Sequence, residues 1–143
     1  MSKTHKIKIK SGDASTGELK ISDKHIWTKK MDSVNWSIKE DANVYEITSI
    51  EKKSGSPEIF RVQPHNIGEG WEGKIELKPN FITTYEYSIL WRAKAGGDIL
   101  TYDPKISVLP NIGILALLPK IVAVVAMILV SIFSFHFFRK RKR

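Results

Sequence analysis

The chain has 143 residues, of which 42% are hydrophobic and 27% are charged, and it contains no cysteine. The lack of cysteine excludes disulfide bonds, thiolate chemistry and cysteine-based zinc sites. All fifteen acidic residues and seventeen of the twenty-three basic ones precede position 111, so most of the net charge of +8 comes from the C-terminal end. The remainder of the chain is close to neutral, which argues against nucleic acid as a partner.

The first thirty residues are basic and predict two short strands. Residues 6–10, KIKIK, alternate apolar and charged side chains as a half-buried strand does, residues 11–17 have the composition of a turn, and a second strand is expected through Leu19 and Ile21. These thirty residues hold eight lysines and three acidic residues. The lysines either contact an anionic lipid or a partner, or keep exposed strand edges from aggregating; we favour the second interpretation.

Several further strands are predicted in the middle of the chain. β-Branched and aromatic residues, in places alternating with polar ones, favour strands over residues 33–39, 43–51, 58–62 and 71–77. Loops are expected between them, over residues 52–57 and over residues 63–69.

The most regular strand pattern covers residues 83–92, TTYEYSILWR. Its apolar side chains alternate with polar ones and should share one face: Tyr85, Tyr87, Ile89 and Trp91. A glycine-containing turn over residues 95–98 and two more strands, 98–102 and 105–109, follow. Seven to nine short strands and no amphipathic helix within about 105 residues predict an all-β sandwich or small barrel, of which we expect the sandwich.

The arrangement of residues 83–108, a long aromatic strand, a glycine-rich turn and a final strand, resembles the last strands of immunoglobulin-like or cupredoxin-like sandwiches. The resemblance is one of fold alone. The inter-sheet cysteines of antibody domains and the histidine and cysteine copper ligands of cupredoxins are absent, so no functional residue is carried over.

A single transmembrane helix is predicted over residues 121–138, IVAVVAMILVSIFSFHFF, which carry no Asp, Glu, Lys or Arg. Eighteen helical residues are roughly 27 Å long, close to the thickness of the hydrocarbon core of a bilayer. The residues expected to span it include Ile121, Val125, Leu129, Phe133 and Phe138. Basic residues flank the span at both ends: Lys120, Arg139, Lys140, Arg141, Lys142 and Arg143.

The predicted organisation is therefore a β-sandwich domain (1–110), a juxtamembrane linker (111–120), a span (121–138) and a basic tail (139–143). The apolar residues 112–118 either lengthen the span or lie in the membrane interface; we favour the interface, because Pro119 suits the first turn of the spanning helix.

Two rules conflict over the orientation of the domain. The basic tail favours a cytoplasmic C-terminus and an extracellular or periplasmic domain. The first residues lack the apolar stretch of a secretory signal peptide, and the span comes at the end of the chain, as in tail-anchored proteins. We expect a single-pass membrane protein with a cytoplasmic domain.

No catalytic, cofactor or metal site is predicted. The four histidines are scattered, and the segment GEGWEG at residues 68–73 matches the glycine motif of dinucleotide sites but precedes an expected strand instead of a helix. Trp27, which is close to Lys29 and Lys30, and Trp71, which follows a glycine-rich loop, are candidate partner contacts. His65, in an expected polar loop, is a third.

The expected function is a non-enzymatic binding or adaptor module that holds another protein at the bilayer. The alternative is a signal-gated effector of the defence or toxin type, which forms homo-oligomers through its β domain and its span and disrupts the membrane. Ser131 and Ser134 are the hydroxyl residues of the span, and contacts between helices in lipid use such side chains.

Overall fold

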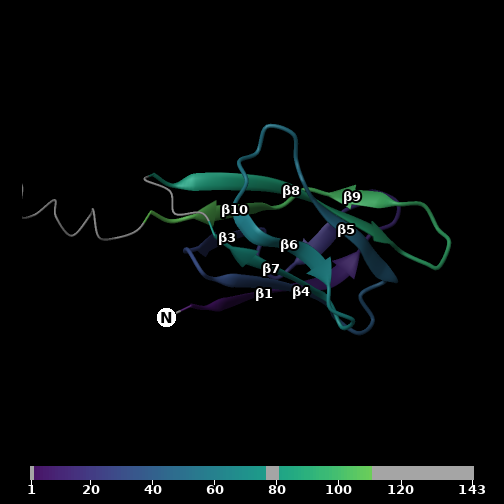
Figure 1. Cartoon of the computed structure of the whole chain (residues 1–143). Helices are drawn as coiled ribbons and strands as arrows, with labels where there is room; N and C mark the ends of the chain where they lie inside the picture. Colours follow the sequence, from purple (N-terminus) through teal and green to yellow (C-terminus); the bar gives the residue numbers. More distant parts are fainter. Residues whose placement is uncertain (1, 77–80, 111–143) are drawn as a thin grey trace, which may run out of the picture. The chain divides into compact units, whose positions relative to one another are not determined.

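The computed structural model describes residues 2–76 and 81–110, which form ten strands (Figure 1). In chain order the strands are β1 (Thr4–Gly12), β2 (Leu19–Ile21), β3 (His25–Thr28), β4 (Ser33–Ile38), β5 (Glu46–Lys52), β6 (Phe60–Asn66), β7 (Trp71–Ile75), β8 (Thr83–Arg92), β9 (Leu100–Tyr102) and β10 (Lys105–Val108). The all-β class predicted from the sequence is confirmed for these residues.

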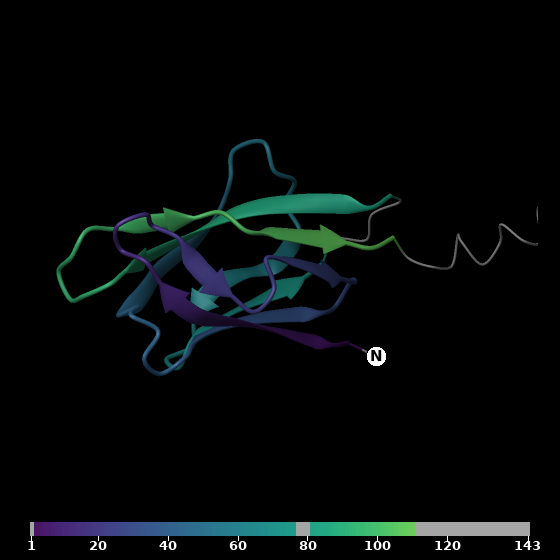
Figure 2. The ribbon, with the colours of Figure 1, turned by 180° about the vertical axis from the view of Figure 1, so that it is seen from behind.

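The strands form two mixed sheets. One sheet has the order β2-β1-β4-β7-β6, and the other has the order β3-β10-β8-β5, with β9 also paired to β8. Most pairs are antiparallel, but β1 pairs with β4, and β3 with β10, in parallel. Figures 1 and 2 show the two sheets as layers, with β8 and β10 in one and β1 and β4 in the other, which is a β-sandwich-like arrangement.

The inward faces of both sheets form one hydrophobic core. The alternation in β8 is as predicted, since Tyr85, Tyr87, Ile89 and Trp91 are buried and the residues between them are partly exposed. The core consists of Ile7, Ile9, Leu19, Ile21, Ile26, Val34, Trp36, Ile47, Ile50, Ile59, Phe60, Ile75, Tyr85, Tyr87, Ile89, Trp91, Tyr102, Ile106 and Val108.

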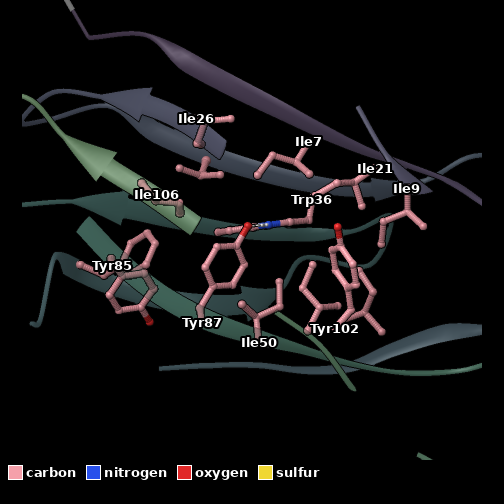
Figure 3. Packing of buried hydrophobic residues seen from close by; sticks show 14 of the residues in the cluster. Ile7, Ile9, Ile21, Ile26, Trp36, Ile50, Tyr85, Tyr87, Tyr102 and Ile106 are labelled. Carbon is pink, nitrogen blue, oxygen red and sulfur yellow. Dashed lines mark hydrogen bonds between the residues drawn. The ribbon is translucent and has the colours of Figure 1, made fainter. Parts of the chain in front are cut away.

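A hydrogen bond crosses the centre of this core. Trp36 of one sheet donates its indole N–H to the Tyr87 hydroxyl of the other, at 3.1 Å, and the two rings meet edge to face (Figure 3). Trp36 and Tyr87 are both buried, and a buried polar atom without a partner is costly. This pair therefore helps to set how the two layers align.

One expectation is wrong, and one strand is not predicted from the sequence. Residues 63–66 belong to strand β6 and not to a loop: two register shifts on either side of Val62 let the strand continue through Pro64 to Asn66. Residues 25–28 form β3, for which no strand is predicted; four residues are too few to show a periodic pattern, and pairing with β10 decides their conformation.

The predicted span at residues 121–138, its flanks and the linker lie outside the described residues. Within residues 2–76 and 81–110, no helix is long and apolar enough to cross a bilayer.

A buried carboxylate joins the N-terminus to the loop before β4. Asp32 accepts hydrogen bonds from the amides of Lys3 (2.9 Å) and Lys29 (3.0 Å) and from His5 Nε2 (2.8 Å). Burial alone raises the pKa of this carboxyl, but the three hydrogen bonds outweigh it and hold the pKa below its ordinary value.

We expect Asp32→Ala to lower the free energy of unfolding at pH 7 by about 2–3 kcal/mol, because two backbone amides lose a charged acceptor. Since the pKa is lowered in the folded state, this stabilisation is complete above the ordinary pKa of an aspartate and disappears as the pH falls through the lowered one. Urea denaturation at pH 7 and pH 3 tests this, with the exposed Asp98→Ala as control. An equal loss at both pH values would contradict it.

Candidate interaction surface

The outer edge of β3 is an unpaired strand edge. β3 pairs with β10 on one side, and no strand of the described residues pairs with its other side. Lys105 donates its amide to the Lys24 carbonyl (3.1 Å), and Leu109 donates to Thr28 (2.8 Å). Since alternate residues of a parallel strand bond to the same neighbour, the N–H and C=O groups of His25 and Trp27 point away from β10.

The first half of β1 has a second unpaired edge. Ser33 donates to the Lys3 carbonyl and Lys39 to the Ile9 carbonyl, both at 2.9 Å, so the odd-numbered residues of β1 bond toward β4. The pairing with β2 covers only residues 9–12, and Ser22 binds the backbone of Lys8. The backbone groups of Thr4 and Lys6 are therefore left facing outward.

A groove of about 520 Å³ lies between these two edges. We call it the β1–β3 groove; it is lined by Lys3, Thr4, His5, Lys6, Asp23, His25, Ile26 and Trp27. One wall is β1 of the first sheet and the other is β3 of the second, so the groove follows one open side of the sandwich. Figure 1 shows β3 beside β10 in one layer and β1 beside β4 in the other.

Trp27 is exposed but held in a defined position. Half of its surface is exposed (50%), and the His25 ring stacks on it with centroids 5.0 Å apart. His25 Nε2 lies 2.8 Å from the hydroxyl of Ser107 on β10, which in turn lies 2.9 Å from the hydroxyl of Thr84 on β8. A large aromatic side chain that is already ordered loses little conformational entropy when a partner covers it.

The opposite side of the sandwich is better protected. β6, the edge strand of one sheet there, contains Pro64 and two register shifts. β5, the edge strand of the other sheet, has a register shift between Ile47 and Ser49. Proline and bulges prevent an edge from pairing with another strand. β3 and the first half of β1 have neither, so the β1–β3 groove is the better place for a new strand to pair.

The other two candidate contacts lie elsewhere. Trp71, on β7, is half-buried and packs against the core, and it lines a hollow of about 210 Å³ together with the exposed Tyr45. His65, on the neighbouring β6, is exposed, and its Nδ1 lies 3.0 Å from the carbonyl of Gln63. His65 and Trp71 thus come close together, whereas Trp27 belongs to the other sheet.

The glycine motif of residues 68–73 has a structural role. It leads into β7, so no helix N-terminus is available there to bind a phosphate. Gly68 has a φ of 92°, and a Cβ atom on Gly70 would collide with the carbonyl oxygen of Trp36. These two glycines make the tight turn and the close strand approach possible.

The sequence did not predict that residues from the start of the chain lie near Trp27. Lys3, His5 and Lys6 are distant from it in the chain, and only the packing of β1 against β3 brings them into one groove. The segment HIWT shows no alternation of polar and apolar residues, so the sequence offers no periodic signal for β3. Among the described residues, no group of three or more histidine, aspartate or glutamate side chains is placed to hold a metal ion.

Comparisons with known proteins do not assign the chain to a family. No family model matches it, and no curated protein sequence matches it. A solved structure of a cysteine protease inhibitor from Entamoeba histolytica is similar over 77% of this chain and 97% of its own, with 14% sequence identity and a TM-score of 0.33. A similarity of that size carries no conclusion about function.

Proposed function

We propose that the chain is a non-enzymatic binding module that holds another protein at a membrane. The observation that supports this most directly is the β1–β3 groove, where two unpaired strand edges flank an ordered and half-exposed Trp27. The lipid bilayer is the second partner, through residues 121–138. The immunoglobulin-like type of sandwich, suggested by residues 83–108, is part of the same proposal.

A protein partner suits the groove better than a small molecule. The groove is open, with polar and charged residues along both walls, whereas small-molecule sites are mostly enclosed and apolar. Tryptophan is the side chain most enriched among residues that dominate protein interfaces. A partner covering Trp27 would also satisfy the outward backbone groups of β3.

The linker limits how far the domain can be from the bilayer. Residues 111–120 number ten, and ten extended residues reach at most about 35 Å. A partner bound to the domain would thus be kept within a few tens of ångströms of the membrane, which raises its local concentration there.

Site-directed crosslinking tests this proposal. A photoreactive phenylalanine analogue at position 27 of the full chain, in membranes of the source cells, is expected to give a discrete protein adduct. The same analogue at position 45, which also replaces an exposed aromatic residue (Tyr45, 59% exposed), should not give that adduct. Removal of residues 121–143 should move both the chain and the adduct out of the membrane fraction. The same adducts from both positions, or none from position 27, would contradict the proposal.

The cytoplasmic orientation of the domain is tested separately. Protease added to sealed right-side-out vesicles is expected to leave residues 1–110 intact, and protease added to inverted vesicles is expected to digest them. Immunoblotting against the domain gives the result. Digestion only in right-side-out vesicles would place the domain outside, as the basic tail alone suggests.

A further inference from the structure

We propose that the partner supplies an acidic, extended segment that pairs with the outer edge of β3 as an additional strand. This inference rests on the proposed function, because it takes the β1–β3 groove to be a protein-binding surface. It goes further by naming the binding mode, the strand involved and the charge of the partner.

The backbone of β3 provides the binding groups. His25 and Trp27 each direct an N–H and a C=O away from β10, so four backbone groups are available along one edge. An extended segment that pairs with them would extend the sheet to partner-β3-β10-β8-β5. Strand addition of this kind obtains affinity from main-chain hydrogen bonds and specificity from alternate side chains.

The side chains of β3 fit the same geometry. His25 and Trp27 lie on the outer face of the sheet, while Ile26 and Thr28 are buried on the inner face. A paired segment would place every second side chain beside the stacked rings of His25 and Trp27. The intervening side chains would point into the groove, whose other wall is β1.

The charge of the groove selects an acidic partner. Lys3 and Lys6 line it, Lys24 adjoins β3, and the described part of the chain offers none of the three an ion-pair partner within 4.0 Å. Asp23 is the one acidic lining residue. Across residues 1–30 the balance is eight lysines to three acidic residues.

The same lysines disfavour pairing of β3 with a second copy of this chain. Two identical edges would bring lysine against lysine, whereas an acidic segment would be attracted. The two interpretations of the basic residues 1–30, protection of a strand edge and contact with a partner, are thus compatible. Repulsion between lysines disfavours pairing with a second copy of β3, and attraction to the lysines favours pairing with an acidic segment.

Fluorescence anisotropy with defined peptides tests the proposal on the full chain in an uncharged detergent. The probe is a fluorescein-labelled heptapeptide that alternates glutamate and valine. Its lysine–valine counterpart tests charge, and a version with N-methyl groups on alternate amides tests backbone pairing. We expect the acidic probe to bind at least about tenfold more tightly than either control, and to weaken when salt is raised from 0.1 to 0.5 M.

Two substitutions at one position separate backbone pairing from side-chain contact. Trp27→Ala and Trp27→Pro both remove the indole, but only proline removes the outward N–H, and that N–H takes no part in the pairing with β10. We expect Trp27→Pro to bind the probe at least about tenfold more weakly than Trp27→Ala. Tyr45→Ala, which removes an exposed aromatic ring elsewhere, should bind like the unchanged protein. Circular dichroism checks that each variant is folded.

The results distinguish this inference from the proposed function. Equal affinities of the alanine and proline variants, equal binding of the N-methylated peptide, or no binding of the acidic probe at millimolar concentration would overturn strand addition. The crosslink from position 27 would then remain an independent test of the proposed function. A preference for the lysine–valine peptide would overturn the assignment of an acidic partner.

Discussion

Trp91→Ala is expected to lower the free energy of unfolding of residues 1–110 by about 3–5 kcal/mol, the range observed for truncating a buried tryptophan. The side chain of Trp91 is fully buried, and its indole N–H donates to the carbonyl of Gly17 at 3.2 Å. The ring lies so close to Gly12 that a Cβ atom there would be 2.6 Å from it. Alanine would therefore leave both a large cavity and a buried carbonyl without its donor.

Urea denaturation followed by circular dichroism measures this loss. The isolated residues 1–110 should first show a β-type spectrum and a cooperative transition, because they contain both sheets and the hydrophobic core between them. Trp27→Ala is the matched control: it removes the same side chain from a half-exposed position and should cost less than about 1 kcal/mol. A loss below about 1 kcal/mol for Trp91→Ala would show that the ring contributes little to the core.

Replacing residues 121–138 with eighteen leucines is expected to keep the chain in the membrane and to leave its binding activity unchanged. A binding module needs only attachment, and polyleucine is apolar enough to provide it. The alternative function, a membrane-disrupting effector, predicts the opposite result. Contacts between helices in lipid depend on small and hydroxyl-bearing residues, and this replacement removes Ser131 and Ser134.

Two measurements decide between these functions. If the chain is a binding module, the polyleucine variant should still pellet with membranes and still give the position 27 crosslink. Bacteria that express the unchanged chain should then grow normally and should not leak dye. Toxicity that appears with the unchanged chain and disappears with polyleucine would favour the effector. The double substitution Ser131→Ala and Ser134→Ala is the matched control, since it changes two side chains and keeps the rest of the segment.

The sequence by itself determined the class of the domain and most of its strands. In β8, aromatic and aliphatic residues alternate with polar ones over ten positions, and a period of two places them on one face in any β structure. In β1, Ile7 and Ile9 are buried for the same reason. Signals of this kind depend only on neighbouring residues, so they can be recognised without knowing the fold.

Tertiary structure decided the pairing of the strands. An alternating pattern states which face of a strand is buried but does not identify its neighbours. The parallel pairs β1–β4 and β3–β10 join segments about 30 and 80 residues apart. The burial of Asp32 has the same origin, because its oxygens bind the amide of Lys3, which precedes β1, the ring of His5 on β1, and the amide of Lys29 in the loop before β4.

The surroundings of Trp27 could not be predicted from the sequence. The sequence indicated that this tryptophan is a candidate for an exposed contact, because His25, Lys29 and Lys30 are close to it in the chain. Only the fold places it on a strand with a free outer edge, stacks it on His25 and sets β1 and its lysines across a groove from it. A surface built from distant segments exists only once the chain has folded, because its geometry is set by contacts between strands and not by the order of residues along them.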